Sequence, residues 1–337
     1  MNYKNMQWLL DKRPTGMPEN ECWKLNEDEI SKIGKNEILI EVKYLSIDPY
    51  MRGRMNDSKS YAAPAKLGEP MTGETVGVVV ESNSNLFEVG DKVCAHKGWQ
   101  TYIRAKDTDP ALMKVPEGDI KLSAYLGTLG MPGRTAYFGL NRVGKPKSGE
   151  TIVVSAASGA VGTVVGQLGK EYGCRVIGIA GGPEKCSFAK DELKFDHCID
   201  YKAENLDEEL KKACPNGVDI YFENVGGPIT DAVLSRMNIG SRISLCGLIS
   251  AYNAESITPG PAWGNLLVKR INLKGFIVFD YIKRYLEAYQ DLSNWVRDGK
   301  IQYKNDIVPG LENASLAIKK LFSGDNNGKL IVQIADL

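Results

Sequence analysis

Three small residues lie between a hydrophobic run and a stretch that can form a helix. Thr151 to Val154 are apolar or β-branched, small residues follow at Ala157, Gly159 and Gly162, and the sequence beyond is compatible with a helix. This order is typical of a buried parallel strand, a tight turn and a helix start, where backbone amides and the helix dipole can face a pyrophosphate. A second hydrophobic segment at residues 174–180 follows at βαβ distance. It favours a dinucleotide-binding loop over a turn that only packs a helix on a sheet.

The end of that second strand carries no carboxylate. NAD sites place an acidic residue about 20 positions past the loop, where it holds the ribose 2′-hydroxyl. Here the strand ends at residues 180–183 (Ala-Gly-Gly-Pro), and the first charges afterwards are Glu184 and Lys185. A 2′-phosphate would find no carboxylate at the strand tip and would have a cation nearby. The sequence therefore favours NADP over NAD. The alternative is that Lys185 is a solvated residue in the first turn of a helix.

Residues that could bind a metal are sparse. The histidines are His96 and His197, and the seven cysteines are scattered without paired spacing. Cys94 and His96 are near neighbours, but a zinc site needs three protein ligands and an open position, so we interpret both as strand residues. We predict no metal, and therefore a reaction that polarises a carbonyl by hydrogen bonding.

Composition narrows the class of protein. The chain has 337 residues with 43% hydrophobic and 25% charged residues, which fits two globular domains. Lys plus Arg equals Asp plus Glu at 42 each, so no basic excess points to nucleic acid or an anionic membrane. No apolar run reaches bilayer length, and an odd cysteine number suits a reduced compartment. We expect a cytoplasmic protein.

The first part of the chain shows strand patterns broken by turns. Strands are expected at residues 37–42, 75–81, from 90 and at 100–104, without intervening helices, which favours an antiparallel, barrel-like domain. Residues 122–141 look helical, with Pro132-Gly133 breaking the helix.

From residue 149 the pattern alternates between strand and helix, which predicts a doubly wound parallel sheet. Strands are expected at 151–155, 174–180, 197–200, 218–223, 242–246 and 273–279, and helices at 162–172, 183–193 and 281–298. The tail returns to a β-like pattern from about residue 301 and ends KLIVQIADL. The predicted fold class is α/β, with a β-rich domain at 1–122 and 300–337 and a nucleotide-binding domain at 123–299.

Seven segments together resemble the zinc-independent branch of the medium-chain dehydrogenase/reductase superfamily. This branch holds the leukotriene B4 dehydrogenase/prostaglandin reductases, alkenal double-bond reductases and curcumin reductases. The segments span most of the chain: YLSIDPYMRGRM (44–55), KLGEPMTGETVGVVVES (66–82), LGMPGRTAYFGL (129–140), AASGAVGTVVGQ (156–167), YFENVGG (221–227), CGLISAYN (246–253) and NNGKLIVQI (326–334). Zinc-dependent relatives carry Gly-His-Glu where this chain reads Thr72-Gly73-Glu74.

The resemblance implies a GroES-like catalytic domain, a Rossmann domain with NADPH in the cleft, and a homodimer. It also implies a set of cofactor-binding residues by position: Met131, Thr135, Gly159, Ala160, Val161, Gly162, Gly181, Lys185, Tyr201, Asn224, Val225, Cys246, Gly247, Tyr252 and Asn327. Met131 as a core residue and Asn327-Gly328 as a simple turn are the alternatives.

The expected reaction is reduction of the C=C bond of an α,β-unsaturated ketone or aldehyde. Without a Lewis acid, attack on the β-carbon of an enone is easier than attack on an isolated ketone, because charge spreads into an enolate. Tyr252 follows the fifth strand at the carboxyl-end crevice and is the expected donor to the enolate oxygen. Tyr50 is expected to share the catalytic site, and the α-carbon is protonated by tyrosine or solvent.

A substrate pocket is expected from Tyr50, Tyr61, Phe279 and Tyr281, and its width would suit bulky conjugated ketones such as curcuminoids or 15-oxoprostaglandins. Two alternatives remain open at this point. One is an NADPH quinone oxidoreductase, and the other is a non-catalytic NADPH-binding protein of the crystallin-like kind.

Overall fold

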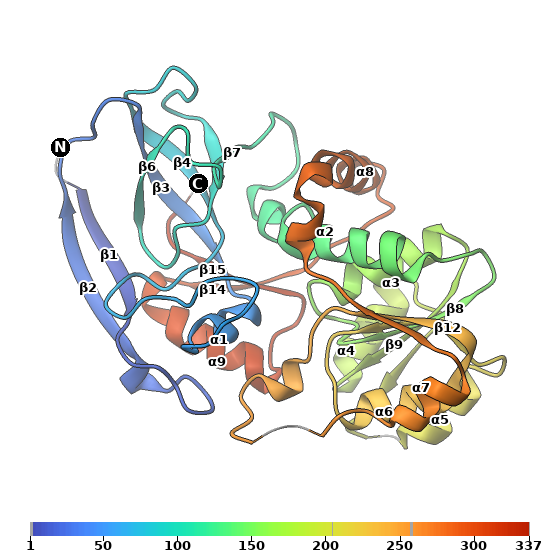
Figure 1. The fold of residues 1–337 in the computed structure, drawn as a ribbon. Helices are drawn as coiled ribbons and strands as arrows, with labels where there is room; N and C mark the ends of the chain where they lie inside the picture. The colour runs from blue at the N-terminus through green and yellow to red at the C-terminus, as the bar shows by residue number, and fades with distance from the viewer. Residues whose placement is uncertain (1–2, 204, 257–258, 337) are drawn as a thin grey trace. The chain divides into compact units, whose positions relative to one another are not determined.

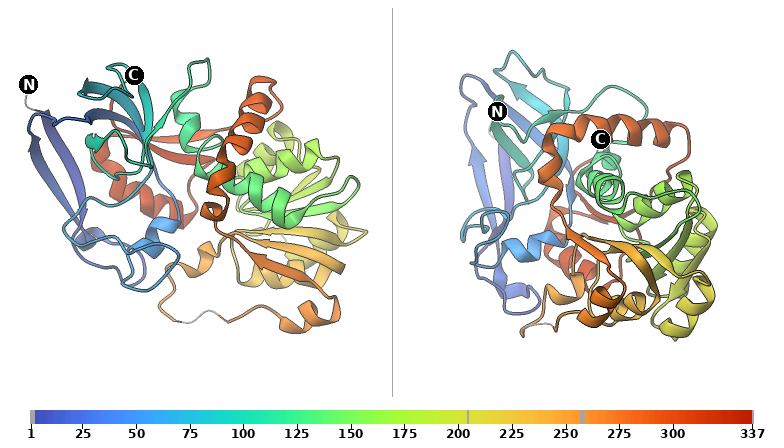
Figure 2. Two further views of the ribbon diagram at one scale, coloured as in Figure 1. Left: turned by 45° about the horizontal axis from the view of Figure 1, so that its top comes forward. Right: turned by 45° about the vertical axis from the view of Figure 1, so that its right-hand side comes forward.

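The computed structural model describes residues 3–203, 205–256 and 259–336. These residues divide into two compact units, drawn together in Figures 1 and 2. Of the described residues, the first unit holds 3–126, 305–326 and 330–336, and the second holds 127–304 and 327–329. The expected domains were 1–122 with 300–337 and 123–299. The first unit instead extends to residue 126, the second extends to residue 304, and residues 327–329 return to the second unit. Residues 1 and 337 of those expected ranges lie outside the described residues.

A seven-stranded sheet forms the first unit. Its order is β14-β15-β3-β4-β5-β7, with β6 paired to β3, and the pairs β15–β3, β3–β4, β3–β6, β4–β5 and β5–β7 are antiparallel. The strands are β3 (Glu37–Ser46), β4 (Thr75–Ser82), β5 (Lys92–Ala95), β6 (Tyr102–Lys106), β7 (Met113–Lys114), β14 (Asn305–Pro309) and β15 (Lys329–Gln333). The strand-rich first unit confirms this part of the predicted fold class.

Besides the two-residue strand β7, four longer elements of the first unit were not expected from the sequence. Strands β1 (Tyr3–Leu10) and β2 (Trp23–Ile30) form an antiparallel pair, and helices α1 (Tyr50–Arg54) and α9 (Ala314–Ser323) accompany the sheet. Most of β2 is exposed, with only Trp23 buried. A strand that is exposed to solvent on both faces lacks the alternation of apolar and polar residues by which strands are recognised in a sequence.

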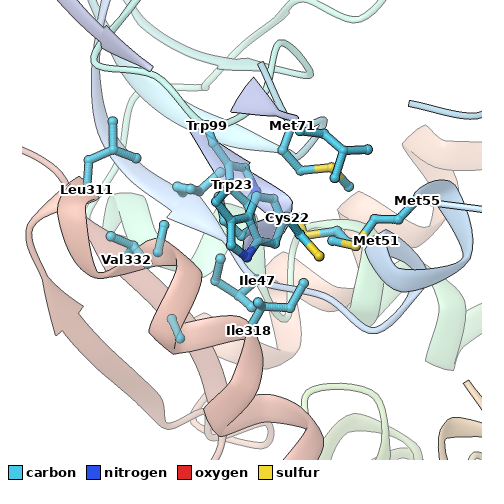
Figure 3. Close-up of a cluster of buried hydrophobic side chains, with 14 of the residues drawn as sticks. Cys22, Trp23, Ile47, Met51, Met55, Met71, Trp99, Leu311, Ile318 and Val332 are labelled. Atoms are coloured by element: carbon cyan, nitrogen blue, oxygen red, sulfur yellow. The ribbon is translucent and has the colours of Figure 1, made fainter. Parts of the chain in front are cut away.

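A hydrophobic cluster fixes α1 within the first unit (Figure 3). The rings of Trp23 and Trp99 stack at its centre, with centroids 4.9 Å apart and planes 16° from parallel. Met51 and Met55, both fully buried, attach α1 to this cluster. The helix is only five residues long and is held by these side chains, because so short a helix has little stability alone.

A six-stranded parallel sheet forms the second unit, in the order β10-β9-β8-β11-β12-β13. This is the doubly wound order of dinucleotide-binding folds, and strand order reverses between β8 and β11. The strands are β8 (Thr151–Ser155), β9 (Arg175–Ala180), β10 (His197–Asp200), β11 (Val218–Glu223), β12 (Met237–Leu245) and β13 (Asn272–Gly275). The predicted Rossmann sheet is confirmed.

Helices cover both faces of this sheet (Figures 1 and 2). They are α2 (Met131–Phe138), α3 (Gly162–Glu171), α4 (Pro183–Ser187), α5 (Leu206–Ala213), α6 (Pro228–Arg236), α7 (Trp263–Val268) and α8 (Tyr285–Arg297). The residues just after α4, 188–192, form a π-type turn, so the helix expected over 183–193 is irregular.

The expected boundaries at 122–141 and 273–279 were wrong. The helix expected at 122–141 is a 3₁₀ segment, Leu122–Leu126 in the first unit, followed by α2 in the second, and Pro132 lies in the first turn of α2 rather than breaking it. Proline is favoured in a first turn because its missing N–H would have no helical acceptor there. The strand expected at 273–279 ends at Gly275, and Val278–Arg284 is a 3₁₀ segment that precedes α8.

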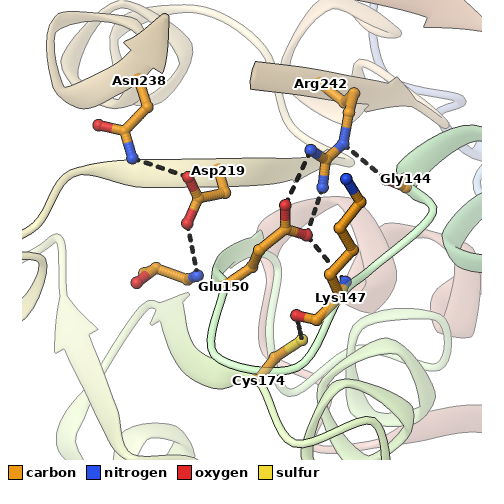
Figure 4. A network of polar contacts seen from close by, with 8 residues as sticks. Gly144, Lys147, Glu150, Cys174, Asp219, Asn238 and Arg242 are labelled. Atoms are coloured by element: carbon orange, nitrogen blue, oxygen red, sulfur yellow. Dashed lines mark hydrogen bonds and ion pairs between the residues drawn. The ribbon is translucent and has the colours of Figure 1, made fainter. Parts of the chain in front are cut away.

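Polar side chains join the amino-terminal ends of the central strands (Figure 4). Asp219 accepts hydrogen bonds from the Thr151 N–H at 2.9 Å and from Asn238 Nδ2 at 2.8 Å. Arg242 pairs with Glu150 and donates from Nε to the Gly144 carbonyl at 2.8 Å. These contacts link β8, β11 and β12 at the amino-terminal ends of the strands. The ligand crevice of such sheets lies at the opposite, carboxyl ends.

Candidate functional site

The turn after β8 leaves no room for a side chain at Gly162. A Cβ there would lie 2.3 Å from the carbonyl oxygen of Ala156, and Ala156 itself has a positive φ of 50°. The Gly159 N–H donates to the Ala156 carbonyl at 2.9 Å, and the Ala157 N–H donates to Ile179 in β9 at 3.0 Å. The turn is thus closed on itself at the start of the ten-residue helix α3, where the Thr163 and Val165 N–H groups donate to the carbonyls of Gly159 and Val161. The backbone is tight here and carries only small side chains at Ala157, Gly159 and Gly162, and its use as a pyrophosphate cradle stays a prediction.

The tip of β9 is formed by glycines whose conformation a neighbouring carboxylate fixes. Asp200, buried at the end of β10, accepts hydrogen bonds from the Gly182 N–H at 2.8 Å and the Lys202 N–H at 3.0 Å. A Cβ at Gly181 would lie 3.0 Å from the Tyr201 ring and 2.9 Å from Lys202 Cε. The Asp200 carboxylate is therefore already engaged by backbone amides, and the Tyr201 ring and the Lys202 side chain lie beside Gly181.

Lys202 is a second cation at this tip that the sequence reading missed. Lys185, the predicted phosphate ligand, lies in α4, the short helix that starts just beyond the same tip. Lys202 follows Tyr201 directly, and that adjacency to a predicted site residue was the available signal. Two cations, with open space at Gly182, favour a doubly charged phosphate.

The returning tail brings Asn327 into the second unit. Its Nδ2 donates to Glu184 Oε1 at 2.8 Å, so it lies beside the segment that carries Lys185. Gly328 adopts a positive φ of 90°, and a Cβ there would collide with the Lys304 carbonyl at 2.3 Å. The Asn-Gly turn therefore does place Asn327 near the predicted phosphate residues of its own unit.

Glu223, at the carboxyl end of β11, organises the next loop and was not singled out from the sequence. It is 1% exposed, and its carboxylate accepts hydrogen bonds from Ser155 Oγ at 2.9 Å and from the hydroxyl of Thr230. The amides of Val225 and Gly226 donate to the same Oε1 at 2.6 and 3.0 Å. An acid at the end of a buried strand, in YFENVGG, was the signal that could have found it.

The predicted residues Asn224 and Val225 are fixed by this carboxylate and its neighbour. Asn224 donates from its backbone N–H to Ser155 Oγ and from Nδ2 to the Ser155 carbonyl, both at 2.8 Å. The two central strands, β8 and β11, thus determine where the Asn224 side chain lies.

Tyr252 folds back over the end of β12. Its Oη accepts a hydrogen bond from the Leu248 N–H at 3.3 Å, and a Cβ at Gly247 would lie 3.0 Å from the same oxygen. The amides of Cys246 and Gly247 donate to the Glu223 carbonyl at 2.9 and 3.1 Å. The structure therefore brings together Cys246, Gly247 and Tyr252 with the Asn224 loop.

The thiol of Cys246 is not a nucleophile in this setting. Burial, followed by the nearby charge of Glu223, raises the pKa of the Cys246 thiol to about 12. At neutral pH it stays protonated, and its contribution to the site is its backbone and its bulk.

Two further predicted groups lie at and near α2. The Thr135 hydroxyl donates to the Met131 carbonyl at 2.8 Å, within α2 itself. Tyr281 stacks on Phe138 of α2, with ring centroids 4.7 Å apart, and burial raises the pKa of its phenol. Phe279 is 48% exposed. Tyr281 therefore presents a fixed ring, and Phe279 an apolar face that remains open within the described chain.

In the first unit, Tyr50 begins α1 and contacts His96. The distance from Tyr50 Oη to His96 Nε2 is 3.1 Å, and Thr72 Oγ1 lies 3.4 Å from His96 Nδ1. Burial raises the pKa of Tyr50 well above its usual value, so the phenol is protonated at neutral pH. Tyr61 is 52% exposed, on the loop after α1. The interpretation of His96 as a strand residue was wrong, because β5 ends at Ala95 and the ring contacts Tyr50.

Gly73 stands where zinc-dependent relatives have histidine, and neighbouring apolar side chains occupy the space that a side chain would need there. A Cβ at Gly73 would lie 2.9 Å from Met51 Cε and 3.1 Å from Leu45 Cδ1. Among the described residues, no three or more His, Cys, Asp or Glu side chains are grouped so that they could hold a metal ion. No helix in the described ranges has the length and apolar character to cross a membrane.

Comparison with known proteins gives consistent matches along the chain. The family model described as the N-terminal domain of oxidoreductase matches residues 6–115, and the zinc-binding dehydrogenase model matches residues 160–295. The NADPH-dependent curcumin reductase of Escherichia coli is 47% identical, covering 98% of this chain and 97% of the relative. The NADP(+)-dependent 2-alkenal reductase of Nicotiana tabacum is 43% identical, covering 98% of both chains.

A solved structure is equally similar. The crystal structure of CurA from Vibrio vulnificus in complex with NADPH shares 50% identity, covers 98% of this chain and 100% of that chain, and has a TM-score of 0.93. Other solved structures with comparable coverage but about 20% identity, such as quinone oxidoreductases, share the fold alone.

Replacing Glu223 distinguishes a structural carboxylate from a simple space-filling side chain. Glu223→Leu removes every acceptor and leaves the half-buried Val225 amide and the buried Gly226 amide without this partner, at a cost of up to about 1–3 kcal/mol for each group left unsatisfied. Glu223→Gln keeps one carbonyl oxygen for those amides and should lose less than half as much. Urea denaturation followed by far-UV circular dichroism measures both. Equal losses for the two variants would contradict this role.

Proposed function

This chain belongs to the zinc-independent medium-chain dehydrogenase/reductases of the curcumin reductase, alkenal reductase and prostaglandin reductase type, and we propose that it uses NADPH to reduce the C=C bond of α,β-unsaturated ketones and aldehydes. The observation that carries this proposal is the agreement of two independent features. Relatives 43–47% identical over nearly the whole chain are named as NADP(H)-dependent reductases of such compounds. Within the described residues, the Asp200 carboxylate at the β9 tip accepts hydrogen bonds from backbone amides, and Lys202 borders the tip.

The residues present fit the cofactor. Gly159, Ala160, Val161 and Gly162 would lie against its pyrophosphate, and Gly181, Lys185 and Tyr201 would lie at its 2′-phosphate, with Lys202 as a further cation. Asn224, Val225, Cys246, Gly247 and Asn327, with Met131 and Thr135 on α2, would line its remaining length. When bound, NADPH supplies a hydride to the β-carbon of the substrate.

The chain's own task is to stabilise the charge that then appears on the substrate oxygen. We assign this task to the Tyr252 hydroxyl, because Tyr252 packs on Gly247 at the carboxyl end of the sheet, where ligands of such folds bind. A hydrogen-bond donor aimed at a developing oxyanion is worth a factor of about 10²–10³ in rate. Tyr50, protonated at neutral pH, is the second catalytic hydroxyl and supplies the proton to the α-carbon.

Aromatic side chains in the proposed pocket determine how large a substrate it can accept. Tyr50, Tyr61, Phe279 and Tyr281 are the proposed pocket residues, and Tyr61 and Phe279 keep about half of their surface open, at 52% and 48%. Flat conjugated ketones of curcuminoid or 15-oxoprostaglandin size match such rings, which bind planar groups by stacking.

Oxidation of NADPH in the presence of chosen acceptors tests the function directly. We expect turnover with alkenals, benzalacetone-type enones and diarylheptanoids, with a saturated ketone as product and with NADPH preferred over NADH. Mass spectrometry of the product distinguishes C=C reduction from carbonyl reduction. Turnover restricted to quinones would favour the quinone oxidoreductase alternative, and NADPH binding without turnover would favour the non-catalytic one.

Tyr252→Phe tests the oxygen-stabilising role. We expect kcat for an enone to fall about a hundredfold, because one donor to the enolate oxygen is lost. The Kd for NADPH, measured by fluorescence, should change less than threefold. Tyr172→Phe, at the opposite end of α3 from the glycine turn, is the matched control and should behave as the wild type. Unchanged turnover in the Tyr252→Phe protein would remove Tyr252 from the mechanism.

A homodimer in the cytoplasm completes the proposal. Strand β13 is the edge of the six-stranded sheet, and all four of its residues are exposed. The helix before it carries exposed apolar side chains at Trp263, Leu267 and Val268, which are 66%, 78% and 68% exposed. An open strand edge with exposed apolar neighbours is a natural surface for a second copy.

Light scattering after gel filtration measures the oligomeric state. We expect a dimer for the wild type and a monomer for the double variant Leu267→Glu/Val268→Glu, since two carboxylates would have to be desolvated at the interface. Leu86→Glu/Val89→Glu, at residues of the first unit that are 63% and 65% exposed, is the matched control and should remain dimeric. A wild-type monomer, or a dimer that survives the first double variant, would contradict this interface.

A further inference from the structure

Three polar side chains form a continuous hydrogen-bonded series within the first unit. Tyr50 begins α1, His96 follows β5, and Thr72 precedes β4. Tyr50 Oη lies 3.1 Å from His96 Nε2, and His96 Nδ1 lies 3.4 Å from Thr72 Oγ1. Both ring nitrogens are therefore engaged, one by the phenol and one by an alcohol.

The packing around this series fixes its geometry. Met51 and Met55 attach α1 to the hydrophobic cluster of Figure 3, and Trp99 inserts into the same cluster three residues after His96. Backbone hydrogen bonds also join the two loops, because the Trp99 N–H donates to Met71 at 2.8 Å and the Gly98 N–H to Gly73 at 3.1 Å. The histidine and the threonine are thus carried by directly paired segments.

Burial, together with nearby charges, keeps the Tyr50 phenol protonated. Burial is the main cause of the raised pKa of Tyr50, and the charges of Asp48 and Glu74 raise it further, while Arg54 opposes them. Asp109, an acid that interacts electrostatically with His96, is paired with Lys97 at 3.0 Å. Tyr50 is consequently a neutral donor, and the partly exposed imidazole connects it to solvent.

We propose that His96 is a positioning residue that returns a proton to Tyr50 in each turnover. This rests on the proposed enone reduction. After the β-carbon has been reduced, the Tyr50 O–H bond breaks and its proton forms the C–H bond at the α-carbon, using the electron pair of the enolate. The Tyr50 oxygen regains a proton from His96 Nε2, while Nδ1 takes one from Thr72, and the Thr72 hydroxyl is restored by water.

These proton transfers together consume one solvent proton for each double bond reduced. The imidazole loses a proton at Nε2 and gains one at Nδ1 in each turnover, and proton exchange with water at its partly exposed ring returns a proton to Nε2 before the next turnover. An imidazole suits this exchange, since each ring nitrogen can act as either donor or acceptor. A tyrosine with a raised pKa would otherwise hold an unfavourable phenolate after it has given up its proton.

His96→Gln tests the relay, because glutamine can still hydrogen-bond to Tyr50 but cannot exchange a proton between two sites. We expect kcat with an enone to fall about tenfold or more, with the Kd for NADPH unchanged. The solvent deuterium isotope effect on kcat should rise, since proton delivery becomes rate-limiting. The primary isotope effect with 4-deuterated NADPH should fall. His197→Gln is the matched control, because His197 begins β10 in the other unit.

Chemical rescue separates the relay from a structural role. Free imidazole in the buffer should restore activity to His96→Ala, and it should not restore Tyr50→Phe. An active wild type whose His96→Gln variant keeps its kcat and isotope effects would overturn the relay alone. So would a His96→Gln variant with reduced kcat but unchanged isotope effects and no rescue of His96→Ala. A wild type that reduces no enone would instead overturn the proposed function, and the relay as a step in it.

Discussion

The second unit depends on one buried carboxylate. Glu223 is 1% exposed, and its oxygens accept from two hydroxyls and two backbone amides. A buried charge is tolerated only when its hydrogen-bonding capacity is filled, so these donors and the carboxylate fix one another. Because Ser155 ends β8 and Thr230 lies in α6, one side chain sets the spacing of a strand, a loop and a helix. The Asn224 loop cannot shift without breaking this arrangement.

The regular part of the fold could be predicted because its signals are local. The parallel strands are short, fully buried apolar runs, such as Thr151–Ser155, and glycines mark the turns between them. Strand β2 was missed for the opposite reason, since its residues after Trp23 are largely exposed and polar. The break assigned to Pro132 was wrong because proline either breaks a helix or begins one, and only the neighbouring turn decides which. Thr128, whose carbonyl lies where a Gly133 Cβ would be, supplies that context.

The candidate site could be predicted only where it is carried by contiguous residues. The glycine turn and the Ala-Gly-Gly-Pro end of β9, which carries no acid of its own, are readable from the chain, whereas the Asp200 carboxylate that β10 brings to this tip is not. Tyr252 was found from its place after the fifth strand, and the resemblance added Tyr50. Contacts between distant segments could not be read in this way. His96 lies 46 residues from Tyr50 and 24 from Thr72, and nothing in the local pattern of β5 shows that its ring leaves the sheet. Lys202 was missed because its position depends on how β10 ends beside Gly181.

The two proposed hydroxyls differ in a way that suits two different tasks. Tyr252 Oη accepts a hydrogen bond from the Leu248 N–H, and an oxygen that accepts one hydrogen bond becomes a better donor of its own proton in another. Such a group can hold a charged oxygen without losing its proton. Tyr50 instead contacts a partly exposed imidazole, through which a lost proton can be replaced. Stabilising an oxygen requires a donor that stays protonated, whereas protonating a carbon requires a donor whose lost proton can be replaced. The surroundings of each tyrosine therefore favour Tyr252 for the enolate oxygen and Tyr50 for the α-carbon.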